Sequence, residues 1–424
     1  MKIVIMAGGK GTRISSVNSN IPKPMIPILG KPVLEYEIDC IRKQGYVDII
    51  IIIGYLGHVI QSYFGDGSQW GVSIQYIVEK EPLGTAGALY YLRNNLSDDF
   101  LLLNGDIIFD VDIKRFYNFH KKHDGVATVF THPNNHPYDS GIIVTDLRGC
   151  VQEWMHKESE RAWYRNRVNA GIHMFSQRIF DSKYALFPSV KKADLDRDVL
   201  QPLIQKKELY AYDSPEYVKD MGTPERLNQV SKDIQSGKVE AKYLKKKQKA
   251  IFLDRDGTIN KYVGFLRNID EFELLPHVGE AIKMMNESGY LVIVISNQPV
   301  IARGEVSEEE LSNIHNKMET LLGREGAYVD AIYYCPHHPD RGYEGERKEL
   351  KMDCTCRKPK PGMILQAAKD FNIDLSQSWM VGDSERDIIV GKSAGCKTVY
   401  LGSPQNDYGQ LYTFDLLIGI CLII

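Results

Sequence analysis

Residues 1–13 read Met1-Lys2-Ile3-Val4-Ile5-Met6-Ala7-Gly8-Gly9-Lys10-Gly11-Thr12-Arg13, a short apolar run that opens into a glycine-rich turn. A nearly continuous run of Ile, Val and Met is typical of a strand buried on both faces of a parallel sheet. Glycines after such a strand let backbone N–H groups approach phosphate oxygens, and basic side chains add positive charge. The stretch therefore predicts a first β-strand and a phosphate-binding turn rather than a signal peptide, and we expect a cytoplasmic protein.

The same pattern of a short apolar run followed by a turn and a helical segment recurs along the 424 residues. The helical spacing is clearest over residues 278–286, where Val278, Ala281, Ile282 and Met285 share one face. This alternation predicts an α/β protein. The further apolar runs are Ile49–Ile53, Leu101–Leu103, Val126–Phe130, Ile251–Leu253, Leu291–Ile295 and Trp379–Val381.

Composition excludes several classes of protein. The 52 basic and 55 acidic residues give a formal charge of −3, which leaves no electrostatic footprint for nucleic acid. No apolar stretch approaches the ~20 residues of a membrane span. The seven cysteines are an odd number in a long chain, which favours a reducing compartment over a disulfide framework. We expect small-molecule partners, and the sequence leaves open whether the chain forms a homo-oligomer.

One segment interrupts the pattern. From Val230 to Lys249 the chain is polar and basic, with lysines at 242, 245, 246, 247 and 249 and few apolar residues. We interpret this segment as a solvated helix end and a linker, because no aromatic residues alternate with the lysines as in a nucleic-acid site. The sequence therefore predicts two domains, residues 1–235 and 249–424, joined by a linker over 236–248.

The first half carries a series of ordered motifs. The glycine spacing after the first strand fits neither the P-loop nor the dinucleotide-binding motif. Together the motifs resemble the sugar nucleotidyltransferase family, which joins a nucleoside triphosphate to a sugar 1-phosphate and releases pyrophosphate. The resemblance covers about residues 1–235. Its motifs are Pro22–Pro27 with Gly30–Tyr36, Glu79–Gly87, Asn104–Asp106, Asn169–Gly171 and Asp220–Glu225.

The resemblance implies a Rossmann-like domain with a mixed sheet and a role for each matching residue. Asp106 and Asp220 match a pair of aspartates that bind Mg²⁺, and oxygen ligands suit this ion. Arg13 and Lys23 match residues that hold the triphosphate and stabilise charge at the α-phosphorus, so both are catalytic candidates. The remaining nucleotide-binding candidates are Ala7, Gly8, Gly9, Gly11, Thr12, Glu79, Gly84, Thr85 and Asp106. The sugar-phosphate candidates are Gly141, Lys157, Asn169 and Gly171.

The base and the sugar are less well defined by these motifs. Glu79 matches the side chain that reads the base edge, and a carboxylate only accepts hydrogen bonds, so it suits the N–H donors of guanine. GTP is therefore favoured as the nucleotide. The family often has a glutamate just before the lysine matched by Lys157, and this chain has His156 there. That glutamate usually contacts sugar hydroxyls, so the sugar stays open.

The second half opens with Asp254-Arg255-Asp256-Gly257-Thr258 after an apolar run. Two carboxylates two residues apart can serve as nucleophile and as general acid. Three further motifs follow in order, Ser296-Asn297, Arg357-Lys358-Pro359, and Gly382-Asp383-Ser384 with Asp387. The set resembles the haloacid-dehalogenase phosphatases over about residues 249–402, with no insertion long enough for a cap domain.

This second resemblance also implies roles. Asp254 would attack phosphorus, and Asp256 would protonate the leaving oxygen and then activate water. Ser296, Asn297, Arg357 and Lys358 would bind the substrate. Asp254, Asp383 and a backbone carbonyl at Asp256 would bind Mg²⁺.

Four soft ligands cluster between residues 335 and 356. Cys335, His337, Cys354 and Cys356 make up a Cys₃His set, the usual composition of a closed structural zinc site. Such a zinc would hold the loop Asp340–Asp353 in a fixed shape and position Arg357 and Lys358. We expect His338 to lie outside the ligand set, beside it or at the surface. Cys40, Cys150, Cys396 and Cys421 are expected to be core residues.

Within the phosphatases, the zinc loop and the run Cys356–Met363 resemble the D-glycero-D-manno-heptose 1,7-bisphosphate phosphatases; histidinol-phosphate phosphatases share the loop. Relatives usually carry Ser-Gly where this chain has Pro299-Val300. A proline removes a backbone N–H and stiffens the loop, so we expect this loop to bind phosphate, or to select the substrate, differently from its relatives. A phosphatase joined to a nucleotidyltransferase suggests consecutive steps, in which loss of the 7-phosphate precedes transfer of GMP to heptose 1-phosphate. The first half would then resemble the heptose 1-phosphate guanylyltransferases.

Two alternatives stay open. One is a mannose 1-phosphate or other hexose 1-phosphate nucleotidyltransferase fused to a phosphatase of different specificity, such as the histidinol-phosphate type. The other is a chain in which one half acts only as a nucleotide-sensing scaffold.

Overall fold

The computed structural model of the chain describes residues 1–9, 21–184, 186–187 and 189–424. Lys10, Gly11, Thr12 and Arg13 of the glycine-rich turn lie outside these residues. The chain forms two compact units, each described by itself. Unit 1 comprises Met1–His132, Ile143–Met155 and Asn169–Glu240, and unit 2 comprises Pro133–Ile142, His156–Val168 and Ala241–Ile424.

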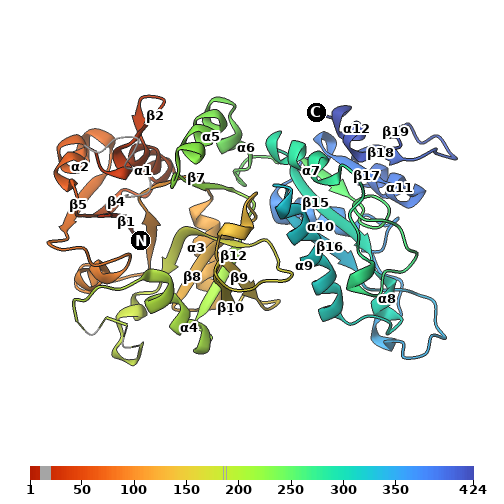
Figure 1. Cartoon of the computed structure of the whole chain (residues 1–424), viewed down its shortest axis with the longest axis horizontal. Helices are drawn as coiled ribbons and strands as arrows, with labels where there is room; N and C mark the ends of the chain where they lie inside the picture. The colour runs from red at the N-terminus through yellow and green to blue at the C-terminus, as the bar shows by residue number, and fades with distance from the viewer. Residues whose placement is uncertain (10–20, 185, 188) are drawn as a thin grey trace. The chain divides into compact units, whose positions relative to one another are not determined.

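Unit 1 is built on a mixed sheet, as the family resemblance implied. Its strand order is β10-β9-β11-β6-β1-β4-β5, and β8 pairs with β11 and β12 (Figure 1). Strand β1 runs parallel to β4 and β6, whereas β11 runs antiparallel to β6. The strands of this sheet are β1 (Lys2–Ala7), β4 (Asp48–Ile53), β5 (Ser73–Val78), β6 (Phe100–Asn104), β8 (Ala127–His132), β9 (Ile142–Thr145), β10 (Val151–Met155), β11 (Val168–Phe175) and β12 (Leu209–Asp213).

Alternate side chains of β1 bury against different helices on the two faces of this sheet. Ile3 and Ile5 pack with the helices α1 (Val33–Lys43), α2 (Gly57–Phe64) and α3 (Ile113–His123). Val4 packs on the other face with the 3-10 helix η3 (Gly87–Leu92), the π-helical segment η7 (Leu195–Leu200) and α4 (Gln201–Gln205). Burial on both faces explains why these strands read as unbroken apolar runs.

Smaller elements complete unit 1. Strands β7 (Ile107–Asp110) and β13 (Tyr217–Asp220) pair antiparallel, and β2 (Pro27–Ile28) pairs with β3 (Lys31–Pro32). Helix α5 (Pro224–Gln235) follows β13 and buries Val230, and the short helix α6 (Lys238–Ala241) comes next along the chain.

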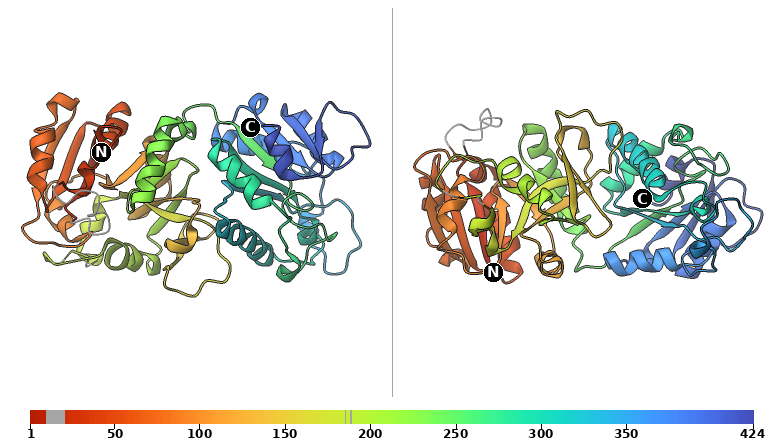
Figure 2. Two further views of the ribbon diagram at one scale, coloured as in Figure 1. Left: turned by 45° about the horizontal axis from the view of Figure 1, so that its top comes forward. Right: turned by 90° about the horizontal axis from the view of Figure 1, so that it is seen from below.

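Unit 2 is built on a parallel sheet in the order β16-β15-β14-β17-β18-β19. Helices α7 (Val278–Glu287), α9 (Glu308–Arg324) and α12 (Leu416–Cys421) pack on the face that holds Ile251 and Leu253, while α10 (Gly362–Phe371) and α11 (Glu385–Ala394) pack on the face of Phe252. The arrangement can be followed in Figure 2. The strands are β14 (Ala250–Leu253), β15 (Leu291–Asn297), β16 (Ala331–Cys335), β17 (Trp379–Gly382), β18 (Lys397–Leu401) and β19 (Leu411–Thr413).

The structure confirms the α/β class and the helix predicted over residues 278–286, with its four apolar side chains buried or partly covered in the core. Because parallel strands end at the same edge of their sheet, the residues at the carboxyl ends of β14, β15 and β17 come together there. Those residues are Asp254, Ser296 and Asp383.

Two sequence expectations are wrong. Lys242 was expected in a solvated segment, but it is 4% exposed and its Nζ lies 2.9 Å from Oδ1 of Asp330. Asp330 also accepts a hydrogen bond from the backbone N–H of Val292 at 2.7 Å. Cys421, expected in the core, is exposed, whereas Cys40, Cys150 and Cys396 are buried as expected. Neither residue's environment follows from the local sequence.

The segment His156–Val168 belongs to unit 2 through buried contacts inside that unit. The side chain of Arg167 lies 3.2 Å from the carboxylate of Glu319 in α9, and both are buried. The backbone N–H of Asn166 donates to the same carboxylate at 2.8 Å.

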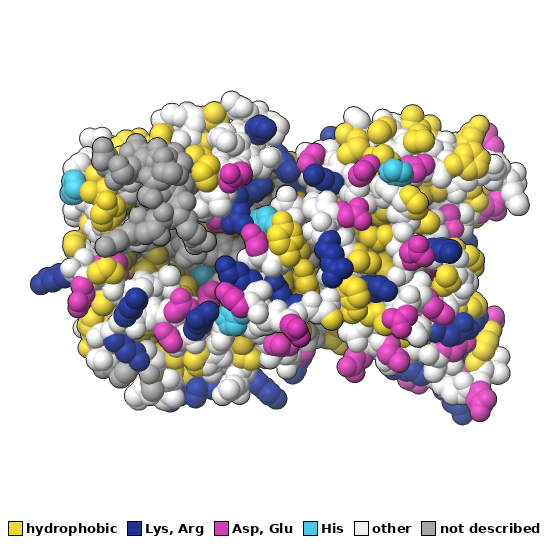
Figure 3. Space-filling model, viewed as in Figure 1, with side chains coloured by type: hydrophobic (Ala, Val, Ile, Leu, Met, Phe, Trp, Pro, Cys, Tyr) yellow, Lys and Arg dark blue, Asp and Glu magenta, His cyan; other side chains and the backbone are white. Residues whose placement is uncertain are grey.

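In the part of the chain that the structure describes, no helix is long and apolar enough to cross a membrane. Figure 3 shows basic and acidic side chains interspersed on the visible face, in keeping with the small net charge.

Candidate functional site

Four of the predicted nucleotide-binding residues, Ala7, Gly8, Gly9 and Glu79, lie where β1 and β5 end. Ala7 closes β1, and Gly8 and Gly9 follow it. A side chain at Gly8 would place its Cβ 2.1 Å from Oε2 of Glu79, the residue directly after β5. Gly8 must therefore be a glycine for Glu79 to reach this edge of the sheet.

Glu79 has an unusual environment for a carboxylate. Its backbone N–H donates to Ile53 O at 2.8 Å, which holds it in line with β4. Its Oε1 atom is buried and has no hydrogen-bond partner among the described residues. Burial raises the pKa of this carboxyl group. A buried oxygen without a partner normally requires an explanation, such as a missing ligand donor.

The pair of aspartates predicted to bind Mg²⁺ is brought together by β7 and β13. Asp220 pairs with Ile107 in this antiparallel ladder, so Asp106 and Asp220 lie at its same end. Each aspartate has a cationic partner: Lys23 forms an ion pair with Asp106, and Arg226 lies 2.8 Å from Asp220. Burial raises the pKa of Asp220, but the charge and hydrogen bond of Arg226, the Gly222 N–H and the charge of Lys23 together outweigh burial and lower it.

Thr85 holds its own loop in place. Its hydroxyl accepts the backbone N–H of Leu195 at 2.7 Å, at the start of η7. Gly84 adopts a left-handed conformation with φ +79°, and a Cβ there would lie 2.4 Å from Ala193 O. Both residues therefore fix the loop against η7.

Asn169 and Gly171 lie together on β11. The side-chain oxygen of Asn169 accepts the Gly171 N–H at 3.2 Å and lies 3.1 Å from Nε2 of His173. His173 is buried, and burial lowers its pKa to about 3, so it is neutral and donates to this oxygen. These contacts fix the amide orientation of Asn169.

The other two sugar-phosphate candidates are not part of unit 1. Gly141 and Lys157 lie in the segments Pro133–Ile142 and His156–Val168 of unit 2, and Lys157 is exposed.

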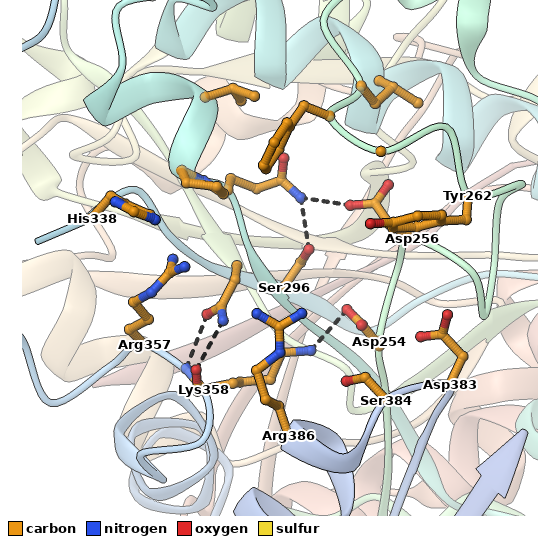
Figure 4. A pocket seen from close by; sticks show the side chains of 17 residues that line it. Asp254, Asp256, Tyr262, Ser296, His338, Arg357, Lys358, Asp383, Ser384 and Arg386 are labelled. Carbon is orange, nitrogen blue, oxygen red and sulfur yellow. Dashed lines mark hydrogen bonds and ion pairs between the residues drawn. The ribbon is translucent and has the colours of Figure 1, made fainter. Parts of the chain in front are cut away.

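In unit 2 a cavity of about 340 Å³ opens at the carboxyl edge of the parallel sheet. Figure 4 shows Asp254 and Asp383 beside each other, with His338 and Arg357 on the other side of the cavity. All the predicted phosphatase residues line it, namely Asp254, Asp256, Ser296, Asn297, Arg357, Lys358 and Asp383.

Lys358 is the cation at the centre of this acidic group. Its Nζ lies 2.8 Å from Oδ1 of Asp254 and 2.6 Å from Oδ1 of Asp387. Burial lowers the pKa of Lys358, but the two carboxylates outweigh burial and raise it, so the ammonium stays charged.

The carboxylates of Asp254, Asp383 and Asp387 offer oxygens within 4.8 Å of one another. Burial, reinforced by the charge of Asp387, raises the pKa of Asp254 to about 7 and that of Asp383 to about 6. Gly257 is in close contact with this group, because a Cβ at residue 257 would lie 2.0 Å from Oδ2 of Asp383. The carboxylate oxygens of this group are close enough together to bind one cation.

Asp256 is oriented away from this acidic group. Its carboxylate accepts hydrogen bonds from Arg255 at 2.9 Å, from Asn260 at 3.1 Å and from Gln298 at 3.0 Å. Gln298 also donates to the Ser296 hydroxyl at 2.7 Å. The two carboxylates of the Asp254-Arg255-Asp256 run therefore have different surroundings.

Asn297 positions a neighbouring residue as well as lining the cavity. Its side chain exchanges two hydrogen bonds with the backbone of Lys358, at 2.9 and 3.0 Å. Arg357 donates to the backbone oxygen of His337 at 3.2 Å and so joins the cavity to the cysteine loop.

The Pro299-Val300 departure falls at the start of the short helix α8 (Pro299–Ala302). At the first helical position the missing N–H of a proline removes no intrahelical hydrogen bond. The proline therefore fits this loop without distorting it.

Cys335, His337, Cys354 and Cys356 converge into one cluster. The three sulfur atoms lie 3.2 to 3.5 Å apart, and Nδ1 of His337 lies 3.4 Å from Sγ of Cys356. Sulfurs around a tetrahedral zinc with Zn–S bonds of about 2.3 Å are ~3.8 Å apart. The donor set and its size therefore suit a metal ion of the zinc type.

The structure also shows residues that the sequence left without a role. Asp387 was part of a motif, but only the fold shows that it is buried and bound to Lys358 and to the Ser384 hydroxyl, which donates at 2.6 Å. Tyr262 and Arg386 line the cavity, and no spacing in the sequence marks them. His338 lies outside the metal cluster as expected, but it is buried against the cavity and not at the surface.

Comparison with known proteins assigns the N-terminal and the C-terminal part of the chain to two families. The Nucleotidyl transferase family profile matches residues 2–237, and the HAD-hydrolase-like profile matches residues 355–411. A glucose-1-phosphate thymidylyltransferase structure from Bacillus anthracis, 24% identical, aligns with a TM-score of 0.50 over 55% of this chain and 96% of that chain, and so shows the fold of the first unit.

Two curated relatives are similar in sequence. The UTP–glucose-1-phosphate uridylyltransferase of Synechocystis is 34% identical over 218 residues, covering 48% of this chain and 55% of the relative. The D-glycero-beta-D-manno-heptose-1,7-bisphosphate 7-phosphatase of Haemophilus ducreyi is 44% identical over 155 residues, covering 36% of this chain and 82% of the relative. The chain is thus a two-domain enzyme that belongs to the nucleotidyl transferase family through residues 2–237 and, through its C-terminal part, to the HAD-type phosphatase family of the Haemophilus enzyme.

Proposed function

We propose that the chain catalyses two consecutive steps of nucleotide-activated heptose synthesis. The C-terminal domain removes the 7-phosphate of D-glycero-D-manno-heptose 1,7-bisphosphate, and the N-terminal domain transfers GMP from GTP to the resulting heptose 1-phosphate. The cavity that joins Asp254, Ser296, Lys358 and Asp383, in a domain 44% identical to a heptose-bisphosphate 7-phosphatase, carries the proposal. The products are phosphate, GDP-heptose and pyrophosphate.

In the phosphatase step Asp254 is the nucleophile and Asp256 the general acid–base. A carboxylate oxygen of Asp254 forms a bond to phosphorus while the bond from phosphorus to the sugar oxygen breaks, and Asp256 gives its proton to that oxygen. Asp256 then takes a proton from water, whose oxygen attacks the aspartyl-phosphate and releases phosphate. Lys358 and Ser296 hold the phosphoryl oxygens and offset their charge.

The acidic group at the cavity fits a magnesium ion. Asp254, Asp383 and the backbone carbonyl of Asp256 would hold it, because carboxylate and carbonyl oxygens suit this ion. When bound, magnesium supplies positive charge between an anionic nucleophile and an anionic phosphate. Cys335, His337, Cys354 and Cys356 would hold a structural zinc, which fits their soft donors and their spacing.

In the nucleotidyl transfer step an oxygen of the sugar phosphate attacks the α-phosphorus of the triphosphate, and pyrophosphate leaves. Lys23 and Arg13 offset the charge at phosphorus, and the glycine-rich motif with Gly8, Gly9, Gly11 and Thr12 binds the phosphates. Asp106 and Asp220 would hold a second magnesium ion, for which their oxygen donors and adjacent register are suited.

Guanine is the proposed base because of Glu79. The buried Oε1 without a partner is suited to the N1–H and N2 amino donors of guanine, which a carboxylate accepts. Uridylyl transfer is the alternative, favoured by the 34% identity to the Synechocystis uridylyltransferase.

The order of steps follows from the chemistry of the sugar. Nucleotidyl transfer consumes a 1-phosphate, and removal of the 7-phosphate leaves one on the same sugar. This connection weighs against histidinol phosphate as the phosphatase substrate, because its product is not a sugar 1-phosphate.

Matched variants test the assignment. With the bisphosphate, GTP and Mg²⁺, we expect the native chain to release phosphate and then pyrophosphate. Asp254→Asn should abolish phosphate release yet retain nucleotidyl transfer when heptose 1-phosphate is supplied. Asp106→Asn should do the reverse, lowering nucleotidyl transfer by at least about 100-fold.

Release of phosphate with no sugar nucleotide formed from any common triphosphate would refute the coupled pathway. If UTP replaced GTP as the better donor, the guanine assignment to Glu79 alone would be wrong.

A further inference from the structure

The general acid–base Asp256 lies at one end of a buried chain of side chains. Arg255 binds both of its oxygens at 2.9 Å through Nη2, and Nε of Arg255 adds a contact at 3.2 Å. Arg255 is 0% exposed. A bidentate guanidinium sets the direction of a carboxylate as well as offsetting its charge.

The far side of Arg255 faces His315. Nη1 of Arg255 lies 3.1 Å from Nε2 of His315, on helix α9. A guanidinium has donors only, so Nε2 must accept and the imidazole must be neutral. Burial and the charge of Arg255 both lower the pKa of His315, in agreement with this assignment.

His315 is itself buried. It is 8% exposed, and its ring centroid lies 5.9 Å from that of Tyr334 on β16. A leucine on the buried face of α9 would fill similar space without the cost of burying a polar ring. The histidine at this position therefore does something that an apolar side chain cannot, which is to accept the Arg255 hydrogen bond.

We propose that His315 is a positioning residue for the phosphatase reaction, which acts on Asp256 through Arg255. Without an acceptor at Nη1 the buried guanidinium would turn toward other oxygens, and the Asp256 carboxylate would lose its fixed direction. The inference rests on the proposed phosphatase chemistry. It predicts that His315 matters most where a proton must reach the leaving oxygen.

Leaving groups separate this role from a merely structural one. A sugar alkoxide needs a proton from Asp256, whereas p-nitrophenolate leaves readily without one. We expect His315→Asn, whose amide is too short to reach Arg255, to lower kcat for heptose 1,7-bisphosphate by about 10- to 100-fold, within the range of general acid–base effects. Transfer of the phosphoryl group from p-nitrophenyl phosphate to Asp254, measured as the single-turnover burst of p-nitrophenolate, should change by less than about threefold, because this first step needs no proton from Asp256.

His315→Gln is the matched rescue variant, because its longer amide can place an oxygen at the position of Nε2. It should recover most of the kcat lost in His315→Asn. Asn313→Ala, at an exposed position of the same helix, should leave both activities unchanged. Asp256→Asn should show the same selective loss as His315→Asn, and inhibition by vanadate should be unaltered in the His315 variants.

An equal loss in heptose bisphosphate turnover and in the p-nitrophenolate burst, or equal activity of the glutamine and asparagine variants, would overturn the positioning role. If the native chain hydrolysed p-nitrophenyl phosphate but not the heptose bisphosphate, the proposed substrate would be wrong. The comparison of glutamine with asparagine would then decide the role of His315 on whichever alkyl phosphate the chain hydrolyses.

Discussion

At Lys358 one buried ammonium group serves two carboxylates, Asp254 and Asp387. Only Asp254 would attack phosphorus, so Asp387 fixes the lysine and adds negative charge. That charge, together with burial, keeps the pKa of Asp254 and of Asp383 raised. At the scale of the residue, protons and cations therefore compete for the carboxylates of the cavity.

This balance predicts how Mg²⁺ binding depends on pH. A group of pKa about 7 is only about one-tenth ionised at pH 6, so we expect Mg²⁺ affinity to fall about tenfold between pH 8 and pH 6. A carboxyl group whose pKa rises on folding stabilises the metal-free protein at low pH, and this contribution is lost as pH rises through about 7. Mg²⁺ should therefore raise Tm more at pH 8 than at pH 6.

Isothermal titration calorimetry with Mg²⁺ at the two pH values measures the change. Asp387→Asn removes one of the charges that raise both pKa values, so its affinity should depend less on pH. A native chain with the same affinity at pH 6 and pH 8 would contradict the assignment of these carboxylates as ligands.

At the scale of the element, the segment after β16 connects the cluster of Cys335, His337, Cys354 and Cys356 to the cavity. Cys335 ends β16, Cys354 and Cys356 come directly before Arg357, and Arg357 binds the backbone of His337. The residues between the ligands contain only a 3-10 turn, η9 (Lys348–Leu350). A segment with so little secondary structure would depend on a bound metal for a fixed shape.

Cys354→Ser should therefore lose the zinc and weaken the phosphatase. We expect metal analysis to find about one zinc per native chain and almost none in the variant. The KM for the phosphatase substrate should rise because Arg357 and Lys358 lose their support. Cys396→Ser, which changes a buried cysteine outside the cluster, should keep its zinc. Full zinc content in Cys354→Ser would rule out this ligand set.

At the scale of the whole molecule, two enzyme families share one chain. The cations of the chain are not gathered for a polyanionic partner, because the net charge is −3 and those near the predicted sites, such as Lys23, Arg226 and Lys358, pair with carboxylates. This distribution suits small phosphorylated substrates.

A consecutive pathway predicts a time lag. With the bisphosphate as the only sugar, phosphate should appear at once and pyrophosphate after a lag, because the 1-phosphate must first accumulate. The lag should shorten as enzyme concentration rises and should vanish when heptose 1-phosphate is supplied. Coupled assays for phosphate and pyrophosphate measure both curves. Pyrophosphate release that precedes phosphate release would reverse the proposed order.

Much of this architecture could be predicted from local sequence. Runs such as Ile251–Leu253 are strands because they are buried on both faces, and parallel strands bring the residues that follow them to one edge. The convergence of Asp254, Ser296 and Asp383 could therefore be predicted. The cysteine cluster could be predicted too, because its ligands are few, soft and close in sequence.

The rest depends on contacts between residues far apart in the chain. Lys242 is buried because Asp330 lies beside it, 88 residues later, and Arg255 meets His315, 60 residues later. The segment that carries Lys157 belongs to unit 2 rather than to the unit of its neighbours in sequence. The sequence by itself determined the α/β class, the order of motifs and the metal-binding residue types, since these follow from short-range spacing. Only the tertiary structure decided which charges pair and which are buried, because packing between distant segments sets both.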